Sequence, residues 1–153
     1  MLEAYRAPGV LSTCRSIGWI YIKERDAIFC RLPSERILTY TKPKMIENKF
    51  GNMGMSFMTE VNTQWVRRDT YGGLLVENIT QATARDIMAY SIPRLETAGF
   101  PTLMHTHDEI VSERPSGEAK IQEMIDIMCA KPIWATGCPI VAEGFITQRY
   151  KKG

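Results

Sequence analysis

The segment 104–110 constrains the fold of this chain more than any other part of the sequence. It reads Met-His-Thr-His-Asp-Glu-Ile, with an apolar run at 100–104 before it and a second one, Ile110-Val111, at its end. Apolar runs on either side of a short polar stretch are typical of a β-hairpin, and its turn would carry Asp108 and Glu109. Carboxylates at a fixed, water-accessible turn can bind a hard divalent cation. An ordinary surface turn with solvated acids fits the same residues.

Length and composition place the chain among globular proteins and exclude little else. With 153 residues it is long enough for one domain with a hydrophobic core. Hydrophobic residues make up 44% and charged residues 24%, and the net charge of +2 neither requires nor excludes nucleic acid. The sequence contains no apolar run as long as a membrane span and no signal-peptide core, so we expect a cytoplasmic protein without a membrane partner.

Metal-binding cysteine patterns are missing. The cysteines are Cys14, Cys30, Cys129 and Cys138. None of these pairs has the short spacing of a zinc knuckle, and we expect free thiols. His105 and His107 could face one side of a strand, but no third soft ligand for zinc is nearby.

Hydrophobic patterning and breaker residues predict an α+β fold. Strands are expected at 18–23, 27–32, 36–40, 55–58, 64–68, 100–106, 109–113 and 140–150, and helices at 2–6, 74–98 and 118–130. The strands at 18–23 and 27–32 would form one hairpin and those at 55–58 and 64–68 another, with Pro43 as a breaker between them. Leu75, Ile79 and Ala82 would lie on one apolar face of the helix at 74–98. We expect an antiparallel sheet that carries the acidic hairpin, with helices covering one of its faces. The chain would form a single domain, 1–153, with a β-rich N-terminal excursion over 1–70 and the acidic hairpin within 71–153.

A second motif precedes the acidic turn. Residues 81–86 read Gln-Ala-Thr-Ala-Arg-Asp within the predicted helix, and residues 107–109 read His-Asp-Glu. In this order the two resemble the C-terminal part of the family A DNA polymerases, the bacterial DNA polymerase I type, and look closest to bacteriophage members. Leu-Val-Glu-Asn at 75–78 and the closing stretch from Glu143-Gly144 to Tyr150 add to the resemblance. It is strong over about 71–150 and weaker over 15–70.

The resemblance implies a fold and a set of catalytic residues. The segment 71–153 would form part of a polymerase palm subdomain. Asp108 would be a catalytic metal ligand for Mg²⁺ or Mn²⁺, and Glu109 would assist, either as a second ligand or through water. A structural role in the hairpin remains an alternative for Glu109.

The same resemblance implies contacts to DNA. His107 would contact the primer-terminal phosphate or sugar, with packing as its alternative. Gln81 would reach the minor groove, where the base acceptors look nearly alike, so it would sense pairing geometry and not sequence. Asn78 and Arg85 could touch the backbone. Here the sequence departs from the bacterial members, which place an Asn where this chain has Glu77.

Two parts of a complete polymerase are missing from the sequence. By analogy with the family, polymerisation needs a second acidic strand, roughly Asp-x-Ser-x-x-Glu, and a fingers helix that holds the deoxynucleoside triphosphate. Two metal ions about 4 Å apart also need carboxylates from more than one element. We therefore expect a C-terminal fragment or split subunit that is an enzyme only when a companion chain, or self-association, completes the site.

Two other functions are compatible with the sequence. One is a non-catalytic protein, derived from a polymerase, that binds primer-template DNA. The other is a metal-dependent nuclease, which ranks last because no second acidic cluster is present. If the chain is phage-encoded, it would act in the cytoplasm of a bacterial host cell.

Overall fold

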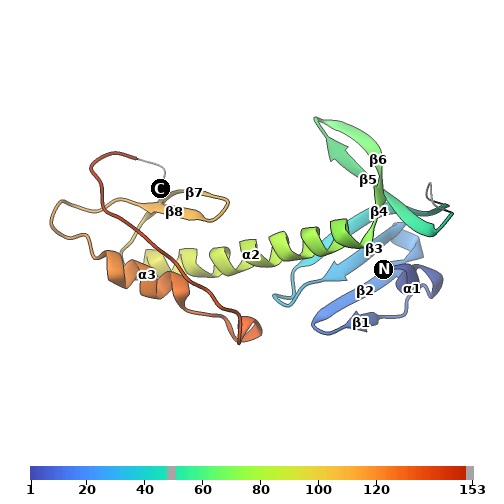
Figure 1. The fold of residues 1–153 in the computed structure, drawn as a ribbon, viewed down its shortest axis with the longest axis horizontal. Helices are drawn as coiled ribbons and strands as arrows, with labels where there is room; N and C mark the ends of the chain where they lie inside the picture. The colour runs from blue at the N-terminus through green and yellow to red at the C-terminus, as the bar shows by residue number, and fades with distance from the viewer. Residues whose placement is uncertain (48–50, 151–153) are drawn as a thin grey trace. The chain divides into compact units, whose positions relative to one another are not determined.

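The structure is a computed structural model that describes residues 1–47 and 51–150. The chain divides into two compact units, Met1–Thr83 and Ala84–Gly153. The division falls inside helix α2 (Gly72–Thr97), which contributes residues to both units (Figure 1). The single domain expected over residues 1–153 stays a prediction.

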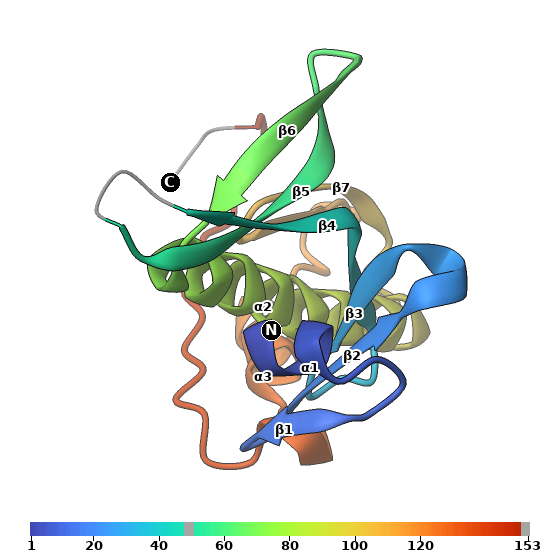
Figure 2. The same cartoon turned by 90° about the vertical axis from the view of Figure 1, so that its right-hand side faces the viewer.

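The first unit is built on a six-stranded antiparallel sheet. Its elements are α1 (Leu2–Arg6), β1 (Ser12–Cys14), β2 (Ile17–Ile22), the 3-10 helix η1 (Lys23–Arg25), β3 (Ala27–Arg31), β4 (Ile37–Glu47), β5 (Met53–Val61) and β6 (Gln64–Thr70). Each strand pairs with the next one along the chain, in the order β1 to β6 (Figure 2). The predicted N-terminal helix and both predicted hairpins of this region are confirmed.

Strand β4 is longer than the sequence predicted, because it continues through Pro43. The pairing of β4 with β5 shifts register between Thr41 and Lys44, and Lys42 adopts a φ of +47°. Proline has no N–H to give to a sheet, so within strands it is found at such irregularities. The Lys42 N–H instead donates to the carbonyl of Asp26 at 2.7 Å. The strand therefore continues through Pro43, with an irregular pairing beside it.

Aromatic packing forms the core of this first unit. The ring of Tyr40 lies 5.7 Å from that of Trp19 and 5.0 Å from that of Phe57, the latter edge-on. Edge-to-face pairs at such distances are favourable. Ile28 and Met55 are buried in the same cluster.

The first half of α2 covers this core. Leu75, Ile79 and Ala82 pack against the cluster, as the predicted apolar face of the helix requires. Arg36 joins the sheet to the helix, since its Nη2 donates to the carbonyl of Ala82 at 2.8 Å.

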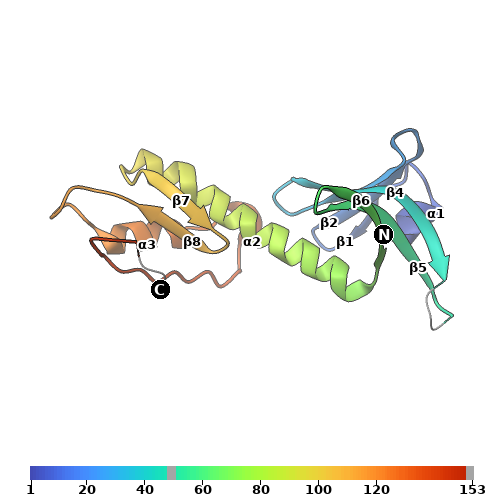
Figure 3. The ribbon, with the colours of Figure 1, turned by 90° about the horizontal axis from the view of Figure 1, so that it is seen from above.

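The second unit contains the acidic hairpin. Its elements are the second half of α2, β7 (Thr102–Thr106), β8 (Glu109–Ser112), α3 (Ile121–Cys129) and the 3-10 helix η2 (Ile133–Ala135) (Figure 3). The buried residues Leu95 of α2, Phe100, Ile110 of β8 and Met124 of α3 form its core. Both helices thus pack against the hairpin, as predicted. No helix within 1–47 and 51–150 is long and apolar enough to cross a membrane.

Helix α2 ends where the sequence predicted. It continues past Pro93 to Thr97, and Gly99 follows with a φ of +79°. A left-handed residue at this position is the usual way to end a helix, and glycine adopts it without a steric penalty. The Gly99 N–H donates to the carbonyl of Glu96 at 3.0 Å, which satisfies one of the last helical acceptors.

Two expectations about the sheet are wrong. Strands β7 and β8 form a separate two-stranded sheet and do not belong to the larger one. The predicted strand at 140–150 is irregular, although its sequence is rich in β-forming residues. Val141, Phe145 and Ile146 are exposed, and no strand among the described residues pairs with this segment. Such residues favour a strand only where a neighbouring strand and a buried face exist. The α+β class and an antiparallel sheet are confirmed, whereas the likeness to a palm stays a prediction.

Candidate functional site

The acidic turn is built by the pairing of β7 with β8. Thr106 pairs with Glu109, so His107 and Asp108 form a two-residue turn between the strands. His107 has a φ of +35°, and tight hairpin turns require positive φ values because these match the twist of the strands. The prediction of a hairpin with Asp108 at its turn is confirmed, and His107 and Asp108 are both exposed. Glu109 was predicted in the same turn, but it is the first residue of β8 and is only half-exposed.

Burial of Ile110 determines the direction of Glu109. Ile110 is only 8% exposed and belongs to the core of this unit. Side chains of successive strand residues point to opposite faces, so Glu109 projects from the face away from that core. There its Oε2 accepts a hydrogen bond from the Tyr150 hydroxyl group at 3.4 Å. Desolvation and the negative charge of Glu109 raise the pKa of the Tyr150 phenol.

The donors at the turn fit part of a magnesium site. Mg²⁺ prefers oxygen ligands, keeps several waters and is commonly held by one or two carboxylates, which Asp108 and Glu109 could supply. Within the part of the chain that the structure describes, no group of three or more His, Cys, Asp or Glu side chains could hold a metal ion. The pair therefore fits one partly hydrated ion and does not fit a complete two-ion centre.

The remaining predicted DNA contacts lie on helix α2. Asn78, Gln81 and Arg85 are three and four residues apart, a spacing that places them along one face of the helix. Arg85 and Gln81 are exposed, and Nε2 of Gln81 donates to Oε1 of Glu77 at 3.2 Å.

Asn78 also makes a hydrogen bond within the protein. Its Nδ2 donates to the hydroxyl oxygen of Tyr40 at 3.5 Å. Burial raises the pKa of Tyr40, and the hydrogen bond from Asn78 offsets part of that rise. A structural role for Asn78 thus stands beside the predicted contact with DNA.

The structure brings together only some of the predicted residues. His107, Asp108 and Glu109 are adjacent at one turn of the second unit. Arg85 belongs to the same unit, whereas Asn78 and Gln81 belong to Met1–Thr83. Sequence reasoning missed Tyr150, because a tyrosine in an irregular segment gives no signal of its distant partner.

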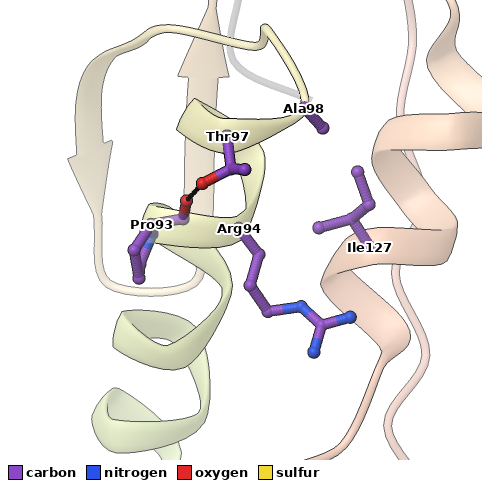
Figure 4. A pocket seen from close by; sticks show the side chains of 5 residues that line it. All are labelled: Pro93, Arg94, Thr97, Ala98 and Ile127. Carbon is purple, nitrogen blue, oxygen red and sulfur yellow. Dashed lines mark hydrogen bonds between the residues drawn. The ribbon is translucent and has the colours of Figure 1, made fainter.

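A shallow hollow lies elsewhere in the second unit, between α2 and α3. Its volume is about 480 Å³, and it is lined by Pro93, Arg94, Thr97, Ala98 and Ile127 (Figure 4). Nη1 of Arg94 donates to the hydroxyl oxygen of Tyr90 at 2.8 Å, and Thr97 Oγ1 donates to the Pro93 carbonyl at 2.8 Å. The lining contains no carboxylate, so this hollow does not extend the acidic site.

The sequence of this chain is similar to part of a phage protein. Over 137 residues, which is 88% of the chain, the sequence is 42% identical to a DNA polymerase of Bacillus phage SP02. This chain is a relative of one segment of a phage DNA polymerase. It spans only 21% of that relative's length, as a polymerase fragment would. No family model matches the chain, and no solved structure matches it.

The match confirms the resemblance to a polymerase fragment and leaves its details as predictions. A match over 88% of the chain cannot avoid the middle of the sequence, so it includes the acidic turn. Three points remain proposals: the assignment to family A, the binding of magnesium ions and the roles of individual residues.

Proposed function

We propose that this chain contributes a metal-binding aspartate and primer-template contacts to a family A DNA polymerase, as a C-terminal fragment or split subunit. One observation carries the proposal: the region related to a phage DNA polymerase contains a hairpin that exposes Asp108 at its turn, beside Glu109. The reaction would be template-directed nucleotidyl transfer, in which a primer 3′-hydroxyl group attacks a deoxynucleoside triphosphate.

The residues of the turn would divide the chemistry between them. Mg²⁺ or Mn²⁺ held at the turn would supply activation of the 3′-hydroxyl group and neutralisation of charge on the leaving pyrophosphate. Asp108 would supply ligand oxygens to the ions from the exposed apex. Glu109 would assist from the first position of β8, and His107 would contact the primer-terminal phosphate or sugar.

Helix α2 would contribute contacts to the primer-template. Gln81 is exposed and can donate to the acceptors that all base pairs present in the minor groove. The side chains of Asn78 and Arg85 follow the same face of the helix and would contact the backbone. Contacts of this kind position the duplex and do not select a sequence.

The acidic pair needs further ligands. Since the described residues supply no third acid near Asp108 and Glu109, we infer that the chain is inactive alone. A companion polypeptide with the second acidic strand and the triphosphate-binding helix, or self-association, would complete the enzyme. Such an assembly would act in the cytoplasm of a bacterial host cell.

Primer extension tests this function. The purified chain is assayed with Mg²⁺ or Mn²⁺, alone and with a polypeptide that carries the missing motifs. We expect incorporation only in the mixture, its loss in Asp108→Asn, and no change in the control Glu118→Gln, which removes an exposed acid outside the turn. Full activity of Asp108→Asn in the mixture would refute the role of this residue, and extension by the monomeric chain alone would refute its incompleteness.

A second candidate is a non-catalytic protein that binds primer-template DNA. The lack of a third metal ligand among the described residues favours it. It predicts duplex binding that persists in Asp108→Asn, together with no incorporation in the presence of any companion chain.

A further inference from the structure

The last described residue of the chain reaches the acidic turn. The hydroxyl group of Tyr150 donates to Glu109 Oε2 at 3.4 Å. Residues 139–150 form no regular helix or strand. Local contacts, and not a ladder of backbone hydrogen bonds, must therefore hold Tyr150 in place.

Two contacts guide this C-terminal segment toward the turn. At Gly144 the backbone passes close to α3, since a Cβ added there would lie 2.7 Å from Cδ1 of Ile121 and 3.7 Å from Cδ1 of Ile125. Glycine permits so close an approach because it has no side chain. Further on, Thr147 Oγ1 donates to the carbonyl of Arg149 at 3.0 Å and accepts from the Arg149 N–H at 3.4 Å. These bonds form a local turn immediately before Tyr150.

We propose that Tyr150 is a positioning residue that orients the Glu109 carboxylate at the acidic turn. The proposal rests on the proposed function, in which Glu109 assists Asp108. Carboxylates that ligate metal ions are usually held by hydrogen bonds from outer residues, and loss of such a partner weakens metal binding about 10–100-fold. Tyr150 is 56% exposed and its bond is long, so the smaller end of this range applies.

Metal affinity provides the first test, and it does not depend on polymerase activity. Mn²⁺ binding to the full chain is measured by electron paramagnetic resonance for the wild type, Tyr150→Phe and Asp108→Asn. Tyr90→Phe is the matched control, because it removes another hydrogen-bonded hydroxyl group of the same unit. We expect a Kd about tenfold higher in Tyr150→Phe, no change in Tyr90→Phe, and loss of binding in Asp108→Asn. In a Glu109→Gln background, Tyr150→Phe should have no further effect.

The outcomes separate this inference from the proposed function. Unchanged or tighter Mn²⁺ binding in Tyr150→Phe, together with lost binding in Asp108→Asn, would overturn the role of Tyr150 and leave the acidic site in place. Unchanged binding in Asp108→Asn would instead overturn the site itself.

A second measurement reports on Glu109 without any metal. The ¹³C signal of the Glu109 carboxylate is followed by NMR in the wild type and in Tyr150→Phe. We expect this signal to move while those of Asp108 and Glu113 stay in place, since only Glu109 loses a hydrogen bond. An unmoved Glu109 signal would overturn the proposal, because a tyrosine that merely fastened the C-terminal segment would leave the carboxylate unchanged.

Discussion

Cys30 lies in the core of the six-stranded sheet, where its thiol has no access to water. Burial disfavours the charged thiolate and raises the pKa of Cys30 from its ordinary value of 9.0 to about 11. Cys14 is exposed on β1. The two thiols therefore differ in their access to water.

This contrast predicts selective labelling. At pH 8 a thiol-specific reagent should modify the exposed Cys14 rapidly and the buried Cys30 far more slowly. The pKa of about 11 lowers the thiolate fraction of Cys30 about a hundredfold relative to a thiol at the ordinary value of 9.0. Mass spectrometry after brief labelling locates the modified residue, and Cys14→Ser serves as the control. Equal rates at the two sites in the folded protein would contradict the burial of Cys30.

The same pKa predicts how stability depends on pH. Because the folded protein holds the Cys30 proton more tightly than the unfolded chain does, the resulting stability is complete below pH 9 and is lost as the pH rises from about 9 to 11. The raised pKa of Tyr40 acts in the same direction. Urea unfolding between pH 8 and 11 should show the decline, and Cys30→Ala should show a smaller one. An identical slope in both proteins would contradict this account.

At the level of single residues, the sequence identified the groups that carry charge but not their partners. Apolar runs flank Asp108 and Glu109, so local pattern alone predicted the hairpin, although Glu109 lies at the start of β8 and not in the turn. The bond from Tyr150 to Glu109 and the one from Arg36 to the Ala82 carbonyl join residues far apart in sequence. No local pattern encodes such pairs.

At the level of elements, breaker residues predicted helix ends better than they predicted strand ends. Gly99 ends α2 because glycine readily adopts the left-handed φ that ends a helix, and this preference depends only on the residue itself. Pro43 looked like a similar stop, but the shift of register beside it lets β4 continue. Strands depend on neighbours that the local sequence does not contain, which is also why the predicted strand at 140–150 does not form.

Gly72, at the start of α2, and Gly99, just after its end, give a matched pair of substitutions that tests this explanation of the helix end. Gly99→Ala should destabilise the protein by about 1–2 kcal/mol, because a Cβ is strained in the left-handed region. Gly72→Ala is the control, since a Cβ there meets nothing within 4 Å and the residue lies at the start of the same helix. Thermal unfolding compares the two variants. Equal stabilities would show that the φ of Gly99 is not what ends the helix.

At the level of the whole molecule, the sequence predicted the α+β class but not the partition of its strands. Pairing within each hairpin follows from short connections, and those pairings were predicted. Whether the acidic hairpin joins the larger sheet depends on packing between distant segments, and the two sheets prove to be separate. The two cores likewise share no residue, and α2 contributes different residues to each.

Separate cores predict separate local stabilities. Ile28 and Leu95 are both fully buried, the first in the core of Met1–Thr83 and the second in that of Ala84–Gly153. Truncation of either to alanine should cost about 2–5 kcal/mol in its own unit. Hydrogen exchange followed by mass spectrometry resolves the effect along the chain.

We expect faster amide hydrogen exchange only in the unit that carries the substitution, either Met1–Thr83 or Ala84–Gly153. Leu95→Ala should accelerate amides of α3 and the acidic hairpin, while the amides of β2 to β5 keep their protection. Ile28→Ala should give the reverse pattern. If either substitution accelerated both regions equally, α2 would couple the two cores into one cooperative unit, and the single domain that the sequence predicted would be the better description.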